Sequence, residues 1–487
     1  MEKALKLAFA RVNYSADYGF YDSGNTYKER DILIPYQLLV LAGSTRTYGI
    51  DVRIFDGEVG LKTERQLTNE ILEWEPDFVG FTATTPDIDR TMYACELIHE
   101  KNPLIIIIIG GSHATAMPNE VLKNQFVDYV VKGQGERAII DIVYSKTNDR
   151  IIESDPLGYR LDPAFDMLDY SDYPFTDLTC GQVKAASVMT AYGCPYGCKF
   201  CFHDKNVIYR SAEDFINDIK YLYNVKQVKY FYIYDDTFLL NKARATYILG
   251  ALESFNNAHF QCLTRANLID EEITRRMVRA NFVRVSMGLE SGSDEILKHV
   301  SKGVSIADAI NACRILHDAG IETRASFILG LPYETHDTIN ETIEFAKSLD
   351  LYHANFNIMT PYPGTEVYEM AKREEGLRFA NKKYETDWSK YRRWGKAIVE
   401  TAELSAEDLE LYQVNAQVEF YSQDKIYEYY YNLFKNGNKS KYFYRPLNFA
   451  WQNKFNKDVP FWSELNGNGA GEQHELNGKR NQVCDRV

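Results

Sequence analysis

The chain has 487 residues, of which 45% are hydrophobic and 14% aromatic, and its formal net charge at pH 7 is −14. This length predicts about three domains, and the acidic balance excludes a broad basic surface for nucleic acid. Eight cysteines are too few for a disulfide scaffold, so we expect a reducing, cytoplasmic setting. The N-terminus lacks signal-peptide architecture, and the longest apolar run, 104–109, is far shorter than the roughly 20 residues of a membrane span.

The first part of the chain, residues 1–145, alternates short apolar segments with amphipathic ones. The segments that predict strands are 5–12, 52–55, 78–82, 104–109 and 129–131, and those that predict helices include 63–74 and 88–100. Strands that are apolar on both faces are typical of a parallel sheet covered by helices. We therefore predict a doubly wound, Rossmann-like α/β domain.

Polar residues and glycines gather where these strands end, which is where ligands bind in such sheets. A glycine lets a ligand approach the backbone closely, and a hydroxyl group can hydrogen-bond that ligand. The candidate binding residues are Thr82, Thr84, Thr85, Gly110, Gly111, His113, Gly133 and Glu136. Each of them alone fits an ordinary turn or a structural position, so the prediction depends on their joint placement.

Residues 146–184 contain prolines and acidic residues without a clear period, which indicates an ordered connector. Beyond it, residues 185–375 alternate strand and helix again. The predicted strands are 186–190, 228–234, 259–263, 283–289, 323–329 and 354–359, and the predicted helices include 212–223, 271–279 and 307–319. Six such units predict a partial (β/α)6 barrel, whose active site would lie at the C-terminal ends of the strands.

Nine residues between the first two of these strands, Gly193–Cys201, have the sequence G-C-P-Y-G-C-K-F-C. The thiols of Cys194, Cys198 and Cys201 lie close enough in sequence to surround one metal centre. Iron–sulfur clusters are usually held by four thiolates, so three would leave one iron open. A structural zinc site with His203 or Cys180 as fourth ligand is the alternative, although the sequence has no second C-x2-C pair.

The C-x3-C-x2-C spacing, with Phe200 before the last cysteine, resembles the signature of the radical S-adenosylmethionine (SAM) enzymes. In that superfamily SAM binds the open iron of a [4Fe-4S] cluster, and an electron from the cluster cleaves it to methionine and a 5′-deoxyadenosyl radical. Later strand ends also resemble the family, with D-D-T-F at 235–238, G-L-E-S-G-S at 288–293 and P-Y-P-G-T at 361–365. The SAM contacts that this resemblance implies are Phe200, Asp235, Arg265, Glu290, Ser326, Leu329 and Gly330.

The segments G-G-S-H-A-T at 110–115 and G-Q-G-E at 133–136 resemble the cobalamin (B12)-binding domain that precedes many radical SAM cores. The resemblance implies that the candidate residues of the first domain contact cobalamin. Other cobalamin folds carry a cobalt-ligating histidine in the loop after the first strand, whereas residues 13–34 contain no histidine. The lower axial position would then be empty or filled by water or another group. A domain that binds no cofactor is the alternative.

The remaining chain is rich in tyrosine. Residues 376–463 predict a helical region, with a helix that starts at Ser405 and continues to about Phe434. Trp388, Tyr391 and Trp394 either close the barrel mouth over substrate or pack as ordinary core residues. Residues 464–487 lack an apolar period and predict disorder.

Together the two resemblances imply a class B, cobalamin-dependent radical SAM methyltransferase. Such an enzyme methylates an unactivated carbon of a small molecule or natural-product intermediate, and it needs an electron donor such as flavodoxin or ferredoxin. Two alternatives stay open. One is a related enzyme that cyclises or rearranges its substrate without methyl transfer, and the other is a non-catalytic sensor that binds cobalamin or zinc.

Overall fold

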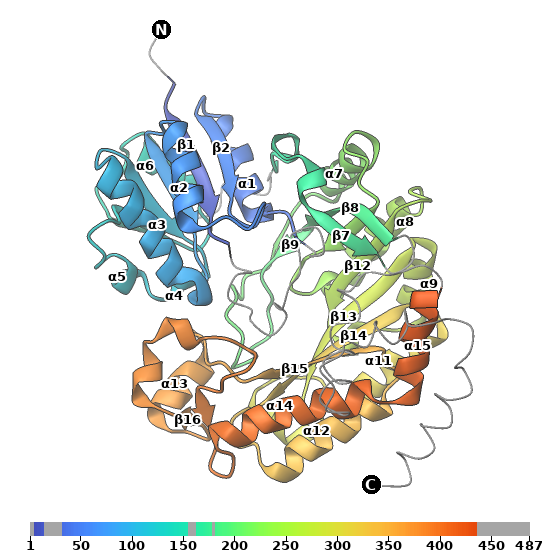
Figure 1. The fold of residues 1–487 in the computed structure, drawn as a ribbon. Helices are drawn as coiled ribbons and strands as arrows, with labels where there is room; N and C mark the ends of the chain where they lie inside the picture. The colour runs from blue at the N-terminus through green and yellow to red at the C-terminus, as the bar shows by residue number, and fades with distance from the viewer. Residues whose placement is uncertain (1–3, 14–31, 154–161, 178–180, 436–487) are drawn as a thin grey trace, which may run out of the picture.

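The computed structural model describes residues 4–13, 32–153, 162–177 and 181–435. Two parallel sheets flanked by helices organise these residues, and a helical region follows them in the chain (Figure 1). The predicted α/β fold class is confirmed, including the Rossmann-like first sheet and the partial barrel. Within the described ranges, no helix is long and apolar enough to cross a membrane.

The first sheet has six strands in the order β2-β1-β3-β4-β5-β6, all paired in parallel. Its strands are β1 (Lys6–Arg11), β2 (Asp51–Asp56), β3 (Phe78–Thr82), β4 (Ile106–Gly110), β5 (Tyr129–Lys132) and β6 (Ile151–Glu153). Its helices are α1 (Tyr36–Arg46), α2 (Glu64–Glu73), α3 (Ile88–Lys101), α4 (Ser112–Ala116), α5 (Pro118–Val121) and α6 (Glu136–Val143). The strand order reverses between β1 and β3, and ligands bind outside the carboxyl ends of strands at such a point.

Two elements of this sheet were not predicted. The edge strand β6 has three residues, which is too short to show an alternating pattern. Helix α1 is buried on most of its circumference, so its sequence lacks the polar stripe that marks a surface helix.

The second sheet has seven strands in the order β15-β14-β13-β12-β11-β8-β7. The six parallel strands are β8 (Gly181–Val188), β11 (Tyr230–Ile233), β12 (His259–Thr264), β13 (Phe282–Glu290), β14 (Glu322–Leu329) and β15 (His353–Ile358), and β7 (Pro174–Asp177) pairs antiparallel with β8. The helices are α7 (Ala212–Asn224), α8 (Lys242–Leu252), α9 (Glu271–Arg279), α10 (Asp294–His299), α11 (Ile306–Asp318) and α12 (His336–Ser348). This sheet forms the predicted half-barrel.

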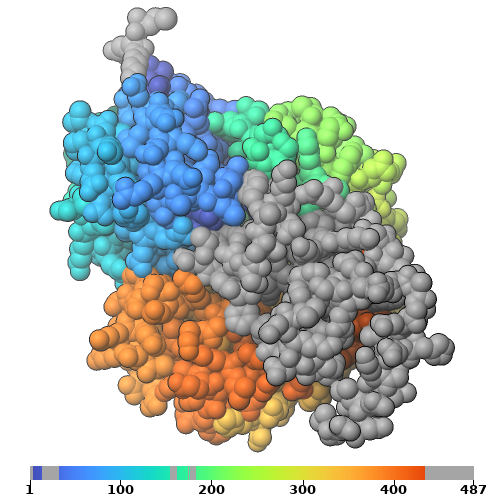
Figure 2. All heavy atoms as spheres, viewed as in Figure 1, coloured from blue at the N-terminus to red at the C-terminus, as the bar shows by residue number. Residues whose placement is uncertain are grey.

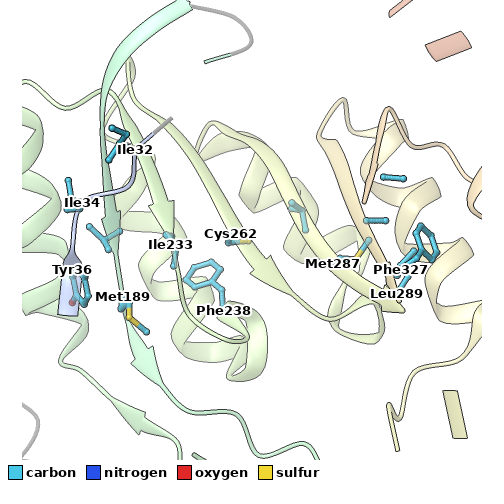
Figure 3. Close-up of a cluster of buried hydrophobic side chains, with 14 of the residues drawn as sticks. Ile32, Ile34, Tyr36, Met189, Ile233, Phe238, Cys262, Met287, Leu289 and Phe327 are labelled. Carbon is cyan, nitrogen blue, oxygen red and sulfur yellow. The ribbon is translucent and has the colours of Figure 1, made fainter. Parts of the chain in front are cut away.

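The two faces of the second sheet differ in polarity. One face is apolar and packs on the helices through residues such as Ile233, Met287 and Phe327, which belong to one large buried cluster (Figure 3). Because side chains alternate along a strand, the neighbouring positions point to the opposite face, which we call the inner face. The inner-face residues used below are Ser187, Tyr230, Tyr232, Gln261, Arg284, Ser286, Glu322, Arg324, Ser326, His353 and Asn355.

A buried ion pair lies on the inner face near the N-terminal ends of the strands. Arg284 is 1% exposed and donates to one oxygen of Glu322 from Nε at 2.9 Å and from Nη2 at 2.7 Å. Its Nη1 donates to the hydroxyl of Tyr230 at 3.2 Å and to Oε1 of Gln261 at 3.3 Å. The active sites of βα barrels lie at the opposite end of the strands. This network therefore has a structural role, in which it fills the N-terminal end of the inner face.

The C-terminal region contains α13 (Glu366–Arg373), β16 (Arg378–Phe379), β17 (Val399–Glu400), α14 (Ala406–Tyr421) and α15 (Asp424–Lys435). Ser405 caps α14 with Asp408, as predicted. The prediction of one helix to Phe434 is wrong, because the helix ends at Tyr421 and a second one begins at Asp424. The tail predicted to be disordered lies outside the described residues.

The C-terminal region also packs against the first domain, as the blue and orange atoms in Figure 2 show. Trp388 is 4% exposed, and its Nε1 donates to Oε1 of Glu120 at 2.6 Å. Its ring meets the His113 ring edge-on at 5.0 Å. Trp388 and Tyr391 are therefore buried core residues at an interdomain contact. Of the two predicted roles, they have the packing role, and they do not close the barrel mouth.

We expect the substitution Arg284→Met to destabilise the protein strongly, because the buried Glu322 carboxylate loses both of its hydrogen bonds from Arg284 and keeps only the looser ion pair with Arg324 at 3.6 Å. Breaking a buried pair in this way costs about 3–5 kcal/mol. The matched control is Arg314→Met, which removes an exposed pair with Asp318 and should cost about 0.5 kcal/mol or less. Urea unfolding followed by circular dichroism measures the loss of stability in each variant. Equal shifts of the two unfolding midpoints would contradict the structural role of the Arg284 network.

Candidate active site at the carboxyl ends of the strands

The cysteine loop, Gly193–Cys201, follows β9 (Ala191–Tyr192), a short strand that pairs with β10 (Ile208–Tyr209). Gly193 has φ +81°, and a Cβ there would lie 2.3 Å from the carbonyl oxygen of Asn206. The next residue, Cys194, donates its backbone N–H to the Asp204 carbonyl at 2.9 Å. Only glycine therefore lets the chain turn at this point and bring the first thiol against the returning segment.

The three thiols of this loop act on one another. Burial raises the pKa of Cys201 to about 12, and negative charge on Cys198, Asp236 and Cys194 raises it further, while Lys302 opposes the shift. Across the described part of the chain, no group of three or more His, Cys, Asp or Glu side chains is set to hold a single metal ion. An iron–sulfur cluster makes a different demand, because its thiolates are distributed over several irons. Three thiols in one short loop, with the Arg265 guanidinium beside Cys198, fit that donor set.

Among the described residues His203 does not join the thiols in a group that could hold a single metal ion, so it does not complete the alternative zinc site. Its Nε2 hydrogen-bonds the carbonyl oxygen of Tyr196 at 2.9 Å, which ties its ring to the cysteine loop. Cys180, the other candidate, lies outside the described residues.

Arg265 follows β12 and reaches the cysteine loop, as the resemblance implies. Its Nη1 lies 3.6 Å from Sγ of Cys198, and its guanidinium stacks 3.7 Å over the ring of Tyr196. Its Nη2 donates to the carbonyl oxygen of Lys302. The side chain is 6% exposed, so it brings a nearly desolvated positive charge to the thiols.

Glu290 ends β13 and forms a buried ion pair that sequence reasoning missed. Its Oε1 lies 2.7 Å from Nζ of Lys302, and both side chains are 8% exposed. Lys302 also lies 5.6 Å from the centre of the Phe200 ring, which places it beside the cysteine loop. A lysine after a short helix is normally a surface residue, so nothing in the sequence marked this one.

Gly288 gives the Glu290 side chain its position. A Cβ on Gly288 would lie 2.1 Å from Oε1 of Glu290 and 3.1 Å from Nζ of Lys302. Glu290 itself has φ +69°, and the pairing of β13 with β14 shifts register between Gly288 and Glu290. The bulge and the glycine together turn the carboxylate back along the rim of the sheet.

Asp235 is buried at the end of β11, where its carboxylate organises the neighbouring strand end. It accepts hydrogen bonds from the backbone N–H and the hydroxyl of Thr190, both at 2.6 Å. Burial raises its pKa to about 6, against the lowering effect of those hydrogen bonds. The adjacent Thr237 hydroxyl lies 3.6 Å from Sγ of Cys194. Asp235 thus braces the cysteine loop, and Asp236 is the exposed carboxylate of this segment.

The predicted residues of β14 differ in their surroundings. Ser326 is half-buried on the inner face, whereas Leu329 is fully buried. Gly330 has φ +88°, and its backbone N–H, like that of Leu331, donates to Oε2 of Glu334. Glu334 is 1% exposed, and burial raises its pKa to about 8. This carboxyl group, which was not predicted, fixes the backbone at the end of β14.

The candidate residues of the first domain meet at the carboxyl ends of β3 and β4. Nδ1 of His113 lies 3.1 Å from the Thr85 hydroxyl, and Thr84 donates its backbone N–H and its hydroxyl to Asp87 at 2.6 Å and 2.9 Å. Gly111 has φ +97°, and a Cβ there would lie 2.5 Å from the Ala83 carbonyl oxygen and 2.9 Å from the Thr82 hydroxyl. The two strand ends therefore lie as close as glycine allows.

This edge of the sheet presents buried polar atoms without partners. In the ranges that the structure covers, Nε2 of His113 and Oε2 of Glu136 have no hydrogen-bond partner. Burial lowers the pKa of His113 to about 4, so the ring is neutral at pH 7. Gly133 is open, since a Cβ there would have no neighbour within 4 Å, and Gly110 is nearly so. Buried polar atoms without a partner lie here beside glycines that have open space around them. This combination fits a site for a polar cofactor such as cobalamin.

The edges of the two sheets meet at Gly364, in the P-Y-P-G-T segment. A Cβ on this residue would lie 2.5 Å from the ring of Phe202 and 3.1 Å from Cβ of Ala116. Phe202 follows the cysteine loop directly, and Ala116 ends α4 of the first domain. Gly364 thus lies between the residue that follows the cysteine loop and the domain that carries the candidate cobalamin residues.

We expect Glu334→Gln to remove a pH dependence of stability. The folded-state pKa of about 8 exceeds the ordinary value of 4.5, so the stabilising contribution of this group is complete below pH 4.5 and is lost as the pH rises through 8. The amide of Glu334→Gln keeps the acceptor oxygen and is neutral at every pH. At pH 8.5 the variant should therefore be more stable than wild type. The difference between the two free energies of unfolding should be on the order of 2 kcal/mol larger at pH 8.5 than at pH 5. Thermal unfolding from pH 5 to 9 measures this difference. Exposed Glu341→Gln is the control, and parallel pH profiles of wild type and Glu334→Gln would refute the assignment.

Comparison with known proteins agrees with this geometry. Residues 188–346 match the family model of the radical SAM superfamily, and residues 30–143 match that of the B12 binding domain. An uncharacterized methyltransferase of Pyrococcus horikoshii is 28% identical over 422 residues, which cover 80% of this chain and 88% of the relative. The anaerobic magnesium-protoporphyrin IX monomethyl ester cyclase of Rubrivivax gelatinosus is 26% identical over 69% of this chain and 66% of the relative.

Solved structures share the fold. The radical SAM methyltransferase TsrM from Kitasatospora setae superposes with a TM-score of 0.60 at 17% identity, over 76% of this chain and 78% of that one. The cobalamin-dependent radical SAM enzyme OxsB superposes with a TM-score of 0.66 at 16% identity, over 86% of this chain and 66% of that one. The two family models, which match residues 30–143 and 188–346 of one chain, establish the family. The chain belongs to the cobalamin-binding radical S-adenosylmethionine enzymes, which use a [4Fe-4S] cluster, SAM and cobalamin.

Proposed function

We propose that this enzyme is a methyltransferase that transfers a methyl group to an unactivated carbon of a small molecule. The observation that carries the proposal is the contact at Gly364, which brings the cysteine loop against the first domain. A cobalamin held at the carboxyl edge of that domain would then face the SAM site directly. Bound together, the cluster and SAM supply a hydrogen-abstracting 5′-deoxyadenosyl radical, and cobalamin supplies a methyl group.

The residues of the cysteine loop and its rim would hold the cluster and SAM. Cys194, Cys198 and Cys201 are the cluster ligands in this proposal. The Glu290–Lys302 pair presents one negative and one positive charge side by side, which matches the ammonium and carboxylate ends of SAM. Arg265 adds a second cation next to Cys198. Backbone around Leu329 and Gly330, fixed by Glu334, would support the adenine, and Ser326 and Phe200 would line the same site.

The first domain would hold and orient cobalamin and exclude water from the site. His113 is fixed by Thr85 and Trp388, and its neutral ring can donate or accept a hydrogen bond through Nε2. Gly110 and Gly133 leave room for the cofactor, and Gly111 lets the two strand ends approach each other. The hydroxyls of Thr82 and Thr84 and the carboxyl group of Glu136 would border the same space. Residues 13–34, which contain no histidine, fall largely outside the described residues.

A second candidate function keeps these cofactors but lacks methyl transfer. The observation in its favour is the similarity to an anaerobic magnesium-protoporphyrin cyclase, at 26% identity. In either case the enzyme needs an electron donor, for which flavodoxin or ferredoxin is our proposal, and it acts on a small molecule. The reaction products distinguish the two functions.

The test is an anaerobic assay of the reconstituted enzyme with cobalamin, SAM and a strong reductant, read by mass spectrometry. Methyl transfer predicts both 5′-deoxyadenosine and S-adenosylhomocysteine, whereas cyclisation or rearrangement predicts 5′-deoxyadenosine alone. The control variant Cys198→Ala should lose about four irons per chain and both products. Buried Cys313→Ala is matched to it chemically and should keep the iron. If wild type with a full cluster formed neither product, the proposal would be wrong.

For the cobalamin site, we expect Gly111→Ala to release the cofactor. The new Cβ would push Ala83 and Thr82 apart at the centre of the proposed site. Gly49→Ala is the control, because Gly49 also has a positive φ, +81°, but has no atom within 4 Å of its Cβ position. Both variants place an alanine at a positive φ, so both carry backbone strain of about 1–3 kcal/mol. Cobalamin retained through gel filtration, measured by its visible absorbance, should be lost only in Gly111→Ala, and equal retention would contradict the placement.

A further inference from the structure

The inner face of the second sheet carries more positive than negative charge below the rim. Arg284, Glu322 and Arg324 lie on neighbouring strand positions there. One oxygen of Glu322 accepts both hydrogen bonds from Arg284, and its other oxygen lies 3.6 Å from Nε of Arg324. Two guanidinium groups thus share one carboxylate, which leaves one positive charge in excess.

The groups packed round this charge are neutral. Burial, followed by the positive charges of Arg324 and Arg284, holds the pKa of His353 well below its ordinary value, so its ring is uncharged at pH 7. Burial and the nearby Glu322 carboxylate raise the pKa of Tyr429 on α15, so the phenol stays protonated. Ser286 and Ser326, the inner-face neighbours of Arg324, are hydroxyls. Among the residues described, none therefore supplies the missing negative charge.

Arg324 differs from Arg284 in its hydrogen bonds. Arg284 is 1% exposed and its guanidinium has partners on all three nitrogens. The Arg324 side chain is 28% exposed, and its guanidinium makes no hydrogen bond to any residue in the described ranges. A guanidinium has five N–H donors in a fixed fork that suits a planar carboxylate or a phosphate. Arg324 is thus open to an anion, whereas Arg284 is not.

Arg324 lies beneath the proposed SAM site and outside it. Its register partners are Ser286 on β13 and His353 on β15, while Ser326 pairs with Gly288 and Asn355. The step from Arg324 to Ser326 is two residues, or roughly 7 Å along the strand. Across the sheet on β8, Ser187 pairs with Tyr232, is 4% exposed, and has an Oγ without a partner among described residues. The inner face therefore offers donors without acceptors below the rim.

We propose that Arg324 binds an anionic oxygen group of the substrate, a carboxylate or a phosphate, and so fixes which carbon reaches the rim. This inference rests on the proposed function and names its substrate class. In the proposed function, Lys302 and Arg265 are the cationic partners of SAM at the rim. Arg324, which lies deeper on the inner face, is then available to the substrate. The reacting carbon would stand several bonds from the anionic group, because about two strand residues separate Arg324 from the rim layer.

The test measures anion binding to full-length, cluster-reconstituted protein with saturating SAM, which keeps small anions off the open iron. The probes are inorganic phosphate and acetate, titrated by calorimetry at low ionic strength. We expect saturable binding of one of them in the millimolar range, at least tenfold weaker in Arg324→Gln and partly kept in Arg324→Lys. Preference for phosphate would assign a phosphate-bearing substrate, and preference for acetate a carboxylate. Arg378→Gln, a matched change at an exposed arginine that pairs with Glu400, should bind like wild type.

Three results would overturn the inference. They are absence of saturable binding of both anions to wild type, equal binding to Arg324→Gln, and loss of SAM affinity in Arg324→Gln. The last result would assign Arg324 to the SAM site instead. Because none of these measurements uses reductant or product analysis, failure of the proposed methyl transfer would appear separately, in the assay of 5′-deoxyadenosine and S-adenosylhomocysteine.

Discussion

The close approach at Gly364 is the constraint on which the rest of the site depends. Parallel strands all end at the same edge of their sheet, so each sheet collects its loops on one side. Gly364 lets Phe202 and Ala116 pack over its bare Cα, and that packing brings the loop edges of the two sheets together. A side chain at this position would separate the cysteine loop from the first domain. Glycine at position 364 is therefore part of what holds the two loop edges together.

Charge at the rim is arranged in buried pairs that leave little room for water. Glu290 with Lys302, and Arg265 with the Lys302 carbonyl and Cys198, form one connected group whose charged side chains are less than 10% exposed. Burying charges is costly unless each has a partner, and here the partners lie on three different strand ends or loops. The pairs therefore tie β12, β13 and the cysteine loop into one surface. Arg324 departs from this pattern, because its side chain is partly exposed and its guanidinium makes no hydrogen bond to a described residue.

Sequence patterns could predict the strands and the strand-end motifs, because both depend on local alternation and on glycine. The strands β3, β13 and β14 lie where the apolar runs predict them, to within a residue at most ends. Lys302, Glu334 and the partners of Trp388 could not be predicted, since the contacts involved are distant in sequence or made by structurally unmarked residues. Trp388 and Glu120, for example, are 268 residues apart. The individual site roles stay predictions until the cofactors are bound.

The contact of Trp388 with the first domain has a consequence for how the protein is made. The strands of that domain are complete when residue 153 leaves the ribosome, yet His113 and Glu120 receive their indole partner only after residue 388. Domains generally fold in the order of their synthesis, so the nascent first domain exposes this apolar surface while the barrel is still being translated. Cobalamin captured during that interval would meet an incomplete wall.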